Sequence, residues 1–192
     1  SRRAKSLGFY AGLSTNGTLI DESQIDEIDD INYDYVGVSI DGMKDTHDKF
    51  RRLDGAFDKS MHGIRLCRDR GLKVGLRFTM TQDNAAELDD MLDLLDREGI
   101  DRFYFSHLNY AGRGNHNRKD DAFFQMTRRA MDTLFERCLD GIRNGEQKEI
   151  VTGNNDADGV YLLMWIEKNF PEHAAHMREK LVQWGGNASG VN

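Results

Sequence analysis

Short apolar runs alternate with amphipathic stretches along the first part of the chain. Four runs have the length and composition of β-strands, at residues 8–15, 34–41, 72–79 and 102–108. The last three are almost continuously apolar, as strands buried on both faces tend to be. Residues 21–31, 58–70 and 84–98 have helical spacing, and the last stretch opens at Asn84 with a variant of the capping box. This alternation predicts an α/β fold with a parallel sheet covered by helices.

The pattern changes after residue 119. Apolar positions at helical spacing continue through residues 120–144, and residues 159–169 and 171–184 are expected to form two further helices. Pro171 suits the first turn of the second of these. We therefore expect an α/β part at residues 1–119 and a helical part at residues 120–192.

Polar side chains follow all four predicted strands. The strands lead into residues 14–17 (STNG), 39–42 (SIDG), 77–79 (RFT) and 106–109 (SHLN). Binding groups in parallel α/β sheets collect at the carboxyl ends of the strands. The sequence therefore predicts a site at this edge of the sheet.

Composition narrows the class of protein. The chain has 192 residues with a net charge of −7, so it lacks the basic character of a nucleic-acid-binding protein. No apolar run approaches the roughly 18 residues that would cross a membrane, and no signal peptide is visible. Two isolated cysteines, Cys67 and Cys138, favour buried thiols in a reducing compartment, and we expect a cytoplasmic protein.

Three strand-end features each have two interpretations. Ser39 and Asp41 suit a ribose or similar polyol, although Asp-Gly is also a common turn. Arg51 or Arg52 could bind a carboxylate with two hydrogen bonds, or belong to a solvated basic patch. Arg77 stands inside an apolar strand and needs a partner, which is either a structural carboxylate such as Asp41 or an anionic ligand.

Histidines and a calcium-like loop give weaker signals. His107 ends a strand beside Asn109 and could be an acid–base group, a metal ligand or a structural histidine. His173 and His176 share a helical face, and we interpret them as surface residues. Residues 154–159 (NNDADG) resemble the start of a calcium loop, but Trp165 occupies the place of the chelating Glu, so a turn with helix caps is favoured.

Longer stretches resemble one family. LSTNGTLID, YVGVSIDGMKDTHDKFRRLDGAFDKSMHGI, GLRFTMTQDN and FYFSHLNYAGRG, in this order, resemble strands three to six of a radical S-adenosylmethionine (SAM) enzyme of the SPASM-related kind. HLNYAGRGNHNRKDDA, VTGNNDADGVYLL and LVQWGGNASGVN resemble its haem d1 biosynthesis branch. The resemblance covers essentially the whole chain.

The resemblance implies a partial (β/α)6 barrel that works with SAM and a [4Fe-4S] cluster. In this family the cluster cleaves SAM reductively, and the resulting 5′-deoxyadenosyl radical abstracts hydrogen from the substrate. For the haem d1 branch the implied substrate is a siroheme-derived tetrapyrrole, whose propionates are replaced by oxo groups. An electron donor is implied as a partner.

The resemblance also implies residue roles. Ser39 would meet the SAM ribose and Arg51 the SAM carboxylate, while Leu108 would lie near the adenine. The other residues expected around the cofactor are Asn16, Asp41 and Arg77. Those expected around the substrate are His107, Asn109, Arg113 and Arg118: the arginines would pair with propionates, and His107 would reach the substrate or its metal.

Three family features are absent from the chain: the Cys-x3-Cys-x2-Cys cluster motif, the Gly-Gly-Glu motif and the C-terminal cysteines of an auxiliary cluster. We expect the chain to be the middle of a longer protein, with the helical part leading towards a cluster domain, and to bind no cluster by itself. One alternative is a cluster-free carrier that binds a tetrapyrrole or nucleotide. Another is a metal-dependent, aldolase-like barrel, for which Asp41 and His107 are too small a ligand set.

Overall fold

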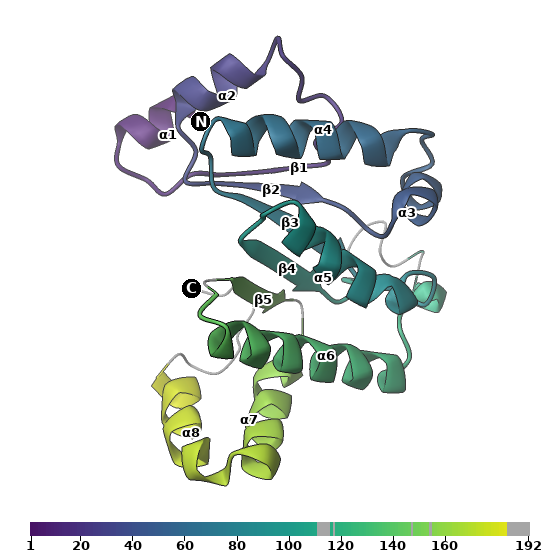
Figure 1. Ribbon diagram of the computed structural model, residues 1–192, viewed down its shortest axis with the longest axis vertical. Coiled ribbons are helices and arrows are strands. Elements are labelled where there is room, and N and C mark those ends of the chain that lie inside the picture. The colour runs from purple at the N-terminus through teal and green to yellow at the C-terminus, as the bar shows by residue number, and fades with distance from the viewer. Residues whose placement is uncertain (111–115, 117, 147, 154, 184–192) are drawn as a thin grey trace.

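A parallel five-stranded sheet forms the centre of the molecule (Figure 1). The computed structural model describes residues 1–110, 116, 118–146, 148–153 and 155–183. The strands are β1 (Gly12–Thr15), β2 (Tyr35–Ser39), β3 (Val74–Thr79), β4 (Arg102–Ser106) and β5 (Glu149–Gly153). They lie in chain order, and each is parallel to its neighbours. The predicted α/β class is confirmed.

Helices connect the strands and complete the C-terminal part. They are α1 (Arg2–Ser6), α2 (Ile25–Ile31), α3 (Lys44–Arg51), α4 (Ala56–Asp69), α5 (Leu88–Arg97), α6 (Phe124–Arg143), α7 (Ala157–Asn169) and α8 (Ala174–Gln183). Short 3-10 helices occur at η1 (Ala85–Glu87), η3 (Arg118–Asp120) and η4 (Pro171–His173). The expected helix at residues 21–31 begins only at Ile25, because the Asp21 side chain closes a turn on the amide and hydroxyl of Ser23.

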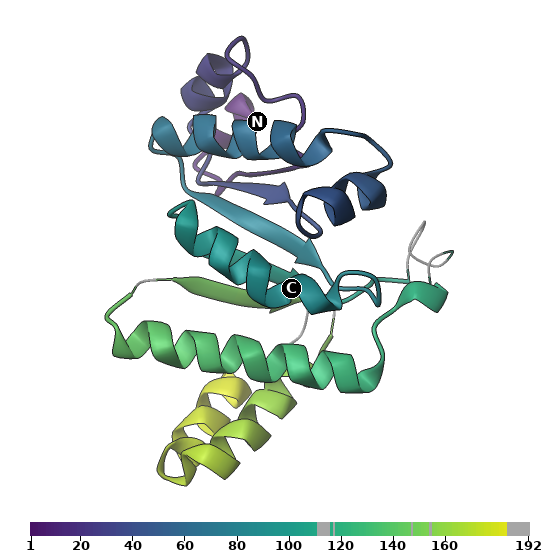
Figure 2. The same cartoon turned by 45° about the vertical axis from the view of Figure 1, so that its right-hand side comes forward.

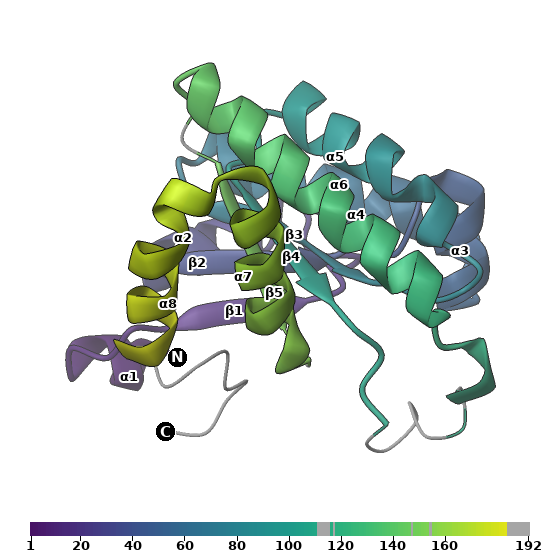
Figure 3. The same cartoon turned by 90° about the horizontal axis from the view of Figure 1, so that it is seen from below.

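The two faces of the sheet differ in chemistry. Side chains alternate between the faces of a strand, and the face that includes Val38, Leu76, Phe78, Phe103 and Phe105 is fully buried. Helices α4, α5 and α6 run side by side along one side of the strands (Figure 3), and residues of all three belong to the same hydrophobic core as that face. Each large apolar side chain that is fully buried in this core stabilises the folded protein by about 1.5–3 kcal/mol.

The C-terminal part is not wholly helical. Residues 149–153 form β5, which pairs with β4 from Arg102 to Ser106. This strand is not predicted from the sequence because it is only five residues long and lies between long helical patterns. Helices α7 and α8 lie beyond α6, at the end of the molecule away from β1 (Figure 2). The division of the chain at residue 119 stays a prediction.

Both cysteines are free thiols, with Cys67 buried in α4 and Cys138 half-buried in α6. In the part of the chain that the structure describes, no helix combines the length and apolar character needed to cross a bilayer. The cytoplasmic location stays a prediction.

Candidate functional site

A row of side chains crosses the sheet on the face opposite the core. Strand register places Ser39 beside Arg77, and Arg77 beside Tyr104. All three side chains are half-buried, whereas their neighbours along each strand point into the core. Ser39 and Arg77 are therefore brought together at the carboxyl edge, where the sequence predicts a site.

Beyond this row, Asp41 and Arg51 form an ion pair. The Asp41 carboxylate accepts a hydrogen bond from the Arg51 guanidinium, and its other oxygen accepts one from the Thr79 amide at 3.2 Å. The Asp41 side chain is 2% exposed and that of Arg51 is 30% exposed. Burial raises the pKa of Asp41, and Arg51 opposes this rise. The buried Asp41 therefore fixes the position of Arg51, and Arg51 is the member of the pair that remains accessible to solvent.

Two buried residues support this pair, and neither is assigned to the site from the sequence. His47 Nδ1 accepts a hydrogen bond from the Asp41 amide at 3.0 Å. Burial, together with the positive charge of Arg51, lowers the pKa of His47 to about 4, so the imidazole is neutral at pH 7. Asn84 donates from Nδ2 to the carbonyls of Asp41 and Thr79 at 3.0 and 2.9 Å. It thus joins two strand ends. The capping-box pattern predicts that Asn84 caps the following helix, but the Asn84 side chain makes no capping hydrogen bond there.

Arg77 does not pair with Asp41. Its guanidinium lies over the Tyr104 ring, 4.5 Å from the ring centroid, because the register places these residues on the same face of neighbouring strands. The structural carboxylate expected for Arg77 is instead engaged by Arg51. A cation–π contact leaves the edge of a guanidinium able to bind an anion.

Asn16 sits in a tight turn at the end of β1. Its Oδ1 accepts hydrogen bonds from the amide and hydroxyl of Thr18 at 3.1 and 3.0 Å, and its carbonyl accepts one from the Ser60 hydroxyl at 2.6 Å. Gly17 follows with φ of 74°, and a Cβ there would come within 2.7 Å of Val38. The turn is thus held against α4, with the exposed Asn16 at the site edge.

His107 and Asp158 form a second polar centre, beyond the ends of β4 and β5. His107 Nε2 lies 3.0 Å from each carboxylate oxygen of Asp158, and the His107 amide donates to the Gly153 carbonyl at 3.2 Å. The two side chains are 11% and 4% exposed. A carboxylate only accepts, so His107 donates from Nε2, and Asp158 fixes the orientation of the ring.

Residues 118–121, in the loop after β4, lie beside Gln82, just beyond the end of β3. Arg118 lies over the Tyr110 ring at 4.4 Å, and Tyr110 donates a hydrogen bond to Asp121. Gln82 Nε2 donates to the carbonyls of Lys119 and Asp121 at 2.9 and 2.8 Å. Arg118 is therefore held on the same side of the sheet as the strand ends.

The remaining predicted residues lie along this loop. Leu108 is half-buried directly after His107, and Asn109 is exposed. Arg113 lies outside the described residues.

The calcium-like stretch has another use. Asn155 Oδ1 accepts a hydrogen bond from the Ala157 amide at 3.1 Å, which agrees with the predicted turn, whereas the N-cap residue Asp156 makes no side-chain capping hydrogen bond to α7. Asp158 turns inward to His107. Asn154 lies outside the described residues. The pairing of Asp158 with His107 joins residues 51 positions apart, and no local sequence signal could reveal it.

Comparison of the sequence with known proteins identifies its family. Residues 1–95 match the family model of the radical SAM superfamily. The chain is 52% identical over 193 residues to pre-heme d1 synthase of Dinoroseobacter shibae, covering 100% of this chain and 48% of that protein. It is 42% identical over 188 residues to Fe-coproporphyrin III synthase of Methanosarcina barkeri, covering 98% of this chain and 47% of that protein. The chain thus spans about half the length of these curated relatives.

Solved structures share the fold. The structure of anSMEcpe with bound AdoMet and Cp18Cys peptide has a TM-score of 0.62 and 23% identity, covering 73% of this chain and 40% of that one. Streptococcus suis SuiB bound to precursor peptide SuiA has a TM-score of 0.66 and 15% identity, covering 84% of this chain and 36% of that one. From its family match, its relatives and its parallel sheet, this chain belongs to the radical SAM superfamily of enzymes.

Proposed function

We propose that this chain belongs to a radical SAM enzyme that modifies the propionate side chains of a siroheme-derived tetrapyrrole in haem d1 biosynthesis. The observation that carries the proposal is the 52% identity to pre-heme d1 synthase along the whole chain. Because the chain spans 48% of that relative, the activity proposed is that of the whole protein. An external electron donor is part of the proposal.

Radical SAM enzymes use SAM and a [4Fe-4S] cluster, which when bound supply a 5′-deoxyadenosyl radical for hydrogen abstraction. The carboxyl edge of the sheet fits SAM. Arg51 Nε is buried without a hydrogen-bond partner among the described residues, and the same guanidinium is partly exposed. A carboxylate accepts well from such a fork. We therefore assign the SAM carboxylate to Arg51 and the ribose to Ser39, with Asn16, Arg77 and Leu108 around them.

Asp41 has a positioning role in this proposal. Its two oxygens are engaged by Arg51 and the Thr79 amide, and its side chain is nearly inaccessible to solvent. It therefore supports cofactor binding through Arg51 and does not meet the ribose itself. His47 and Asn84 hold Asp41 in turn, through its amide and its carbonyl.

The described residues do not fit the cluster. Within residues 1–110, 116, 118–146, 148–153 and 155–183, no three His, Cys, Asp or Glu side chains are grouped to hold a metal. Burial raises the pKa of the Cys67 thiol to about 11 and also raises that of Cys138, whereas thiolates are what an iron–sulfur cluster requires. We assign no cluster ligand to this part of the chain.

On the substrate side, the proposal rests on the loop after β4. Arg118 is exposed beside Tyr110 and would pair with a propionate. His107, oriented by Asp158, would contact the substrate. Asn109 and Arg113 are assigned to the substrate from the sequence resemblance alone.

Binding of SAM tests the cofactor assignment. Replacing Arg51 with Gln should weaken SAM binding by about tenfold or more, because a charge-assisted contact contributes roughly 1.5–3 kcal/mol. Arg52→Gln is the matched control, because Arg52 is the next residue along the chain and its side chain is exposed and has no assigned contact. Isothermal titration calorimetry on both variants measures the difference, and equal affinities would refute the assignment.

Turnover tests the substrate class. The whole protein to which this chain belongs, reconstituted anaerobically, should form 5′-deoxyadenosine and change the mass of a siroheme-derived tetrapyrrole in the presence of SAM and a reductant. Formation of iron coproporphyrin III from this substrate would instead favour the activity named for the 42% identical relative. Arg118→Ala should weaken tetrapyrrole binding far more than SAM binding, and equal losses would contradict the role of Arg118.

A further inference from the structure

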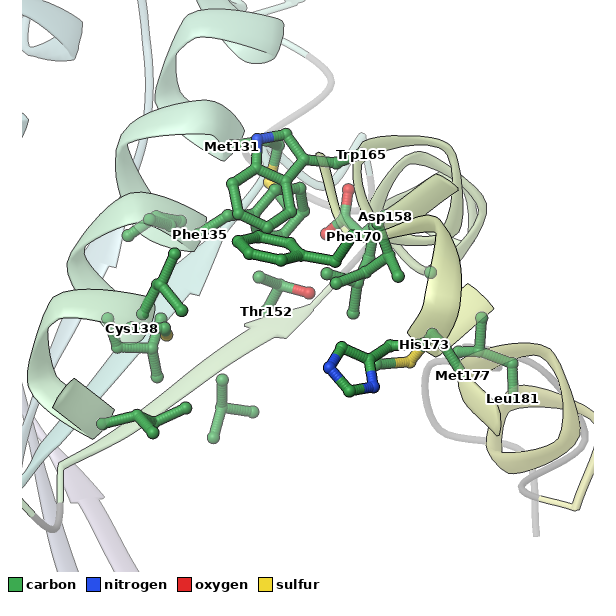
Figure 4. Close-up of a pocket in the computed structure, with 18 residues that line it drawn as sticks. Met131, Phe135, Cys138, Thr152, Asp158, Trp165, Phe170, His173, Met177 and Leu181 are labelled. Atoms are coloured by element: carbon green, nitrogen blue, oxygen red, sulfur yellow. The ribbon is translucent and has the colours of Figure 1, made fainter. Parts of the chain in front are cut away.

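A cavity of about 620 Å³ lies between α6, β5 and the α7–α8 pair (Figure 4). Its walls are mostly aliphatic and aromatic, with Met131, Leu134, Ile150, Leu162 and Leu181 among them. Sites for small organic ligands typically measure about 300–1,000 Å³ and are lined in this way. The cavity therefore has the size and lining of a site for a largely apolar molecule.

Aromatic rings line one side of this cavity. Phe135 and Trp165 have centroids 5.6 Å apart, and Trp165 and Phe170 are also 5.6 Å apart. The three rings come from α6, from α7 and from the residue directly after α7, and they gather above Thr152 in Figure 4. The rings are tilted to one another by 58° and 46°, so a flat conjugated ligand gains apolar contact from all three and can stack on one of them.

One imidazole faces the same cavity. His173 lies in η4 beside Met177, at the rim opposite α6 (Figure 4). Its side chain is 70% exposed, and its ring nitrogen lies 3.8 Å from the Glu172 carboxylate, beyond hydrogen-bond length. An imidazole nitrogen with this access can act as an axial ligand to the iron of a flat macrocycle.

The cavity also adjoins the site described above. Asp158 contributes to its lining and at the same time holds His107 at the carboxyl edge of the sheet. A ligand in the cavity would therefore be stored next to the loop assigned to the substrate. Charged propionates are costly to bury without partners, and the cavity lining includes no Lys or Arg among the residues that the structure describes, so every propionate would have to reach solvent at the open rim.

We propose that this cavity binds an iron tetrapyrrole, with the macrocycle against Phe135, Trp165 and Phe170 and with His173 as an axial ligand to the iron. The proposal rests on the proposed function, which supplies the ligand class. It adds a binding site on the far side of β5, built from the C-terminal helices, and a role for a histidine that the sequence suggests to be a surface residue.

Absorbance titration with ferric coproporphyrin III and with metal-free coproporphyrin III tests the proposal. In the unmodified protein the ferric form should show the band shift of an axial nitrogen ligand. His173→Ala should abolish this shift and weaken ferric binding by about tenfold, while metal-free binding changes by less than about twofold. His176→Ala is the matched control, because His176 lies in the adjoining α8 and is not among the cavity-lining residues.

Filling the cavity separates apolar packing from iron ligation. Leu181→Trp should weaken binding of both macrocycles by about tenfold. If this variant folds poorly by circular dichroism, Leu162→Trp in α7 should give the same result. An unchanged band shift in His173→Ala, or unchanged affinity in a folded cavity-filling variant, would overturn the proposal. So would binding of neither macrocycle by the unmodified protein. The proposed function is tested separately, by the formation of 5′-deoxyadenosine with a siroheme-derived substrate, so its outcome does not depend on these binding results.

Discussion

Protonation of His47 should unfold the protein more readily in acid. The imidazole is fully buried, and its Nδ1 accepts the hydrogen bond from the Asp41 amide. Burial lowers its pKa from an ordinary 6.5 to about 4. The unfolded chain therefore binds a proton between pH 6.5 and pH 4 that the folded protein does not, so stability falls as the pH falls through this window.

The size of the effect follows from this shift. A fall in the pKa of His47 from 6.5 to about 4 corresponds to about 3 kcal/mol when the titration is complete. Between pH 7 and pH 4.5 the same two pKa values give a loss of about 2 kcal/mol in the free energy of unfolding. Small domains are stable by about 5–15 kcal/mol in total, so the loss is large enough to measure.

The assay compares unfolding by urea at pH 7 and pH 4.5 for the unmodified protein and for His47→Asn. The Asn amide oxygen can take the place of Nδ1 as acceptor, but it does not titrate in this range. The unmodified protein should lose about 2 kcal/mol more than the variant. His62→Asn is the control, because the His62 side chain is 49% exposed, and it should behave as the unmodified protein does. Equal losses in the unmodified protein and in His47→Asn would refute the reasoning.

Three further substitutions have defined outcomes. Asp158→Leu should lower the free energy of unfolding by about 1–3 kcal/mol, because the His107 N–H loses its buried acceptor; a change near zero in urea unfolding would contradict this. Asp48→Ala should cost about 1–2 kcal/mol in the same assay, since its carboxylate accepts the Gly55 and Phe57 amides at the start of α4. Gly37→Ala would put a Cβ 2.8 Å from the Tyr35 ring and 2.9 Å from the Arg77 side chain. Because this would displace Arg77, calorimetry should detect weaker SAM binding. Gly12→Ala, with its nearest contact at 3.7 Å, should not weaken it.

Regular periodicity made most elements predictable. Strands β2, β3 and β4 are continuous apolar runs, and α5 has an apolar stripe on one face, so local pattern and tertiary burial agree. Two elements lack such a pattern. Helix α3 (KDTHDKFR) is almost entirely polar, with only His47 buried, and β5 is short and only partly buried apart from its last residue.

The sequence by itself determined the fold class and the edge of the sheet that carries the polar side chains. Strand ends are local features, and parallel connections bring them to one edge whatever the exact register. Ser39 and Arg77 could therefore be selected from their places at the strand ends alone.

Only the tertiary structure decided which of these side chains meet. The sequence suggested Asp41 as a partner for Arg77, whereas the register places Arg77 over Tyr104 and Asp41 pairs with Arg51. His107 and Asp158 meet because β5 lies beside β4. Such contacts depend on how elements distant in the chain are placed in three dimensions, and the residues at each end of the contact carry no mark of their partner.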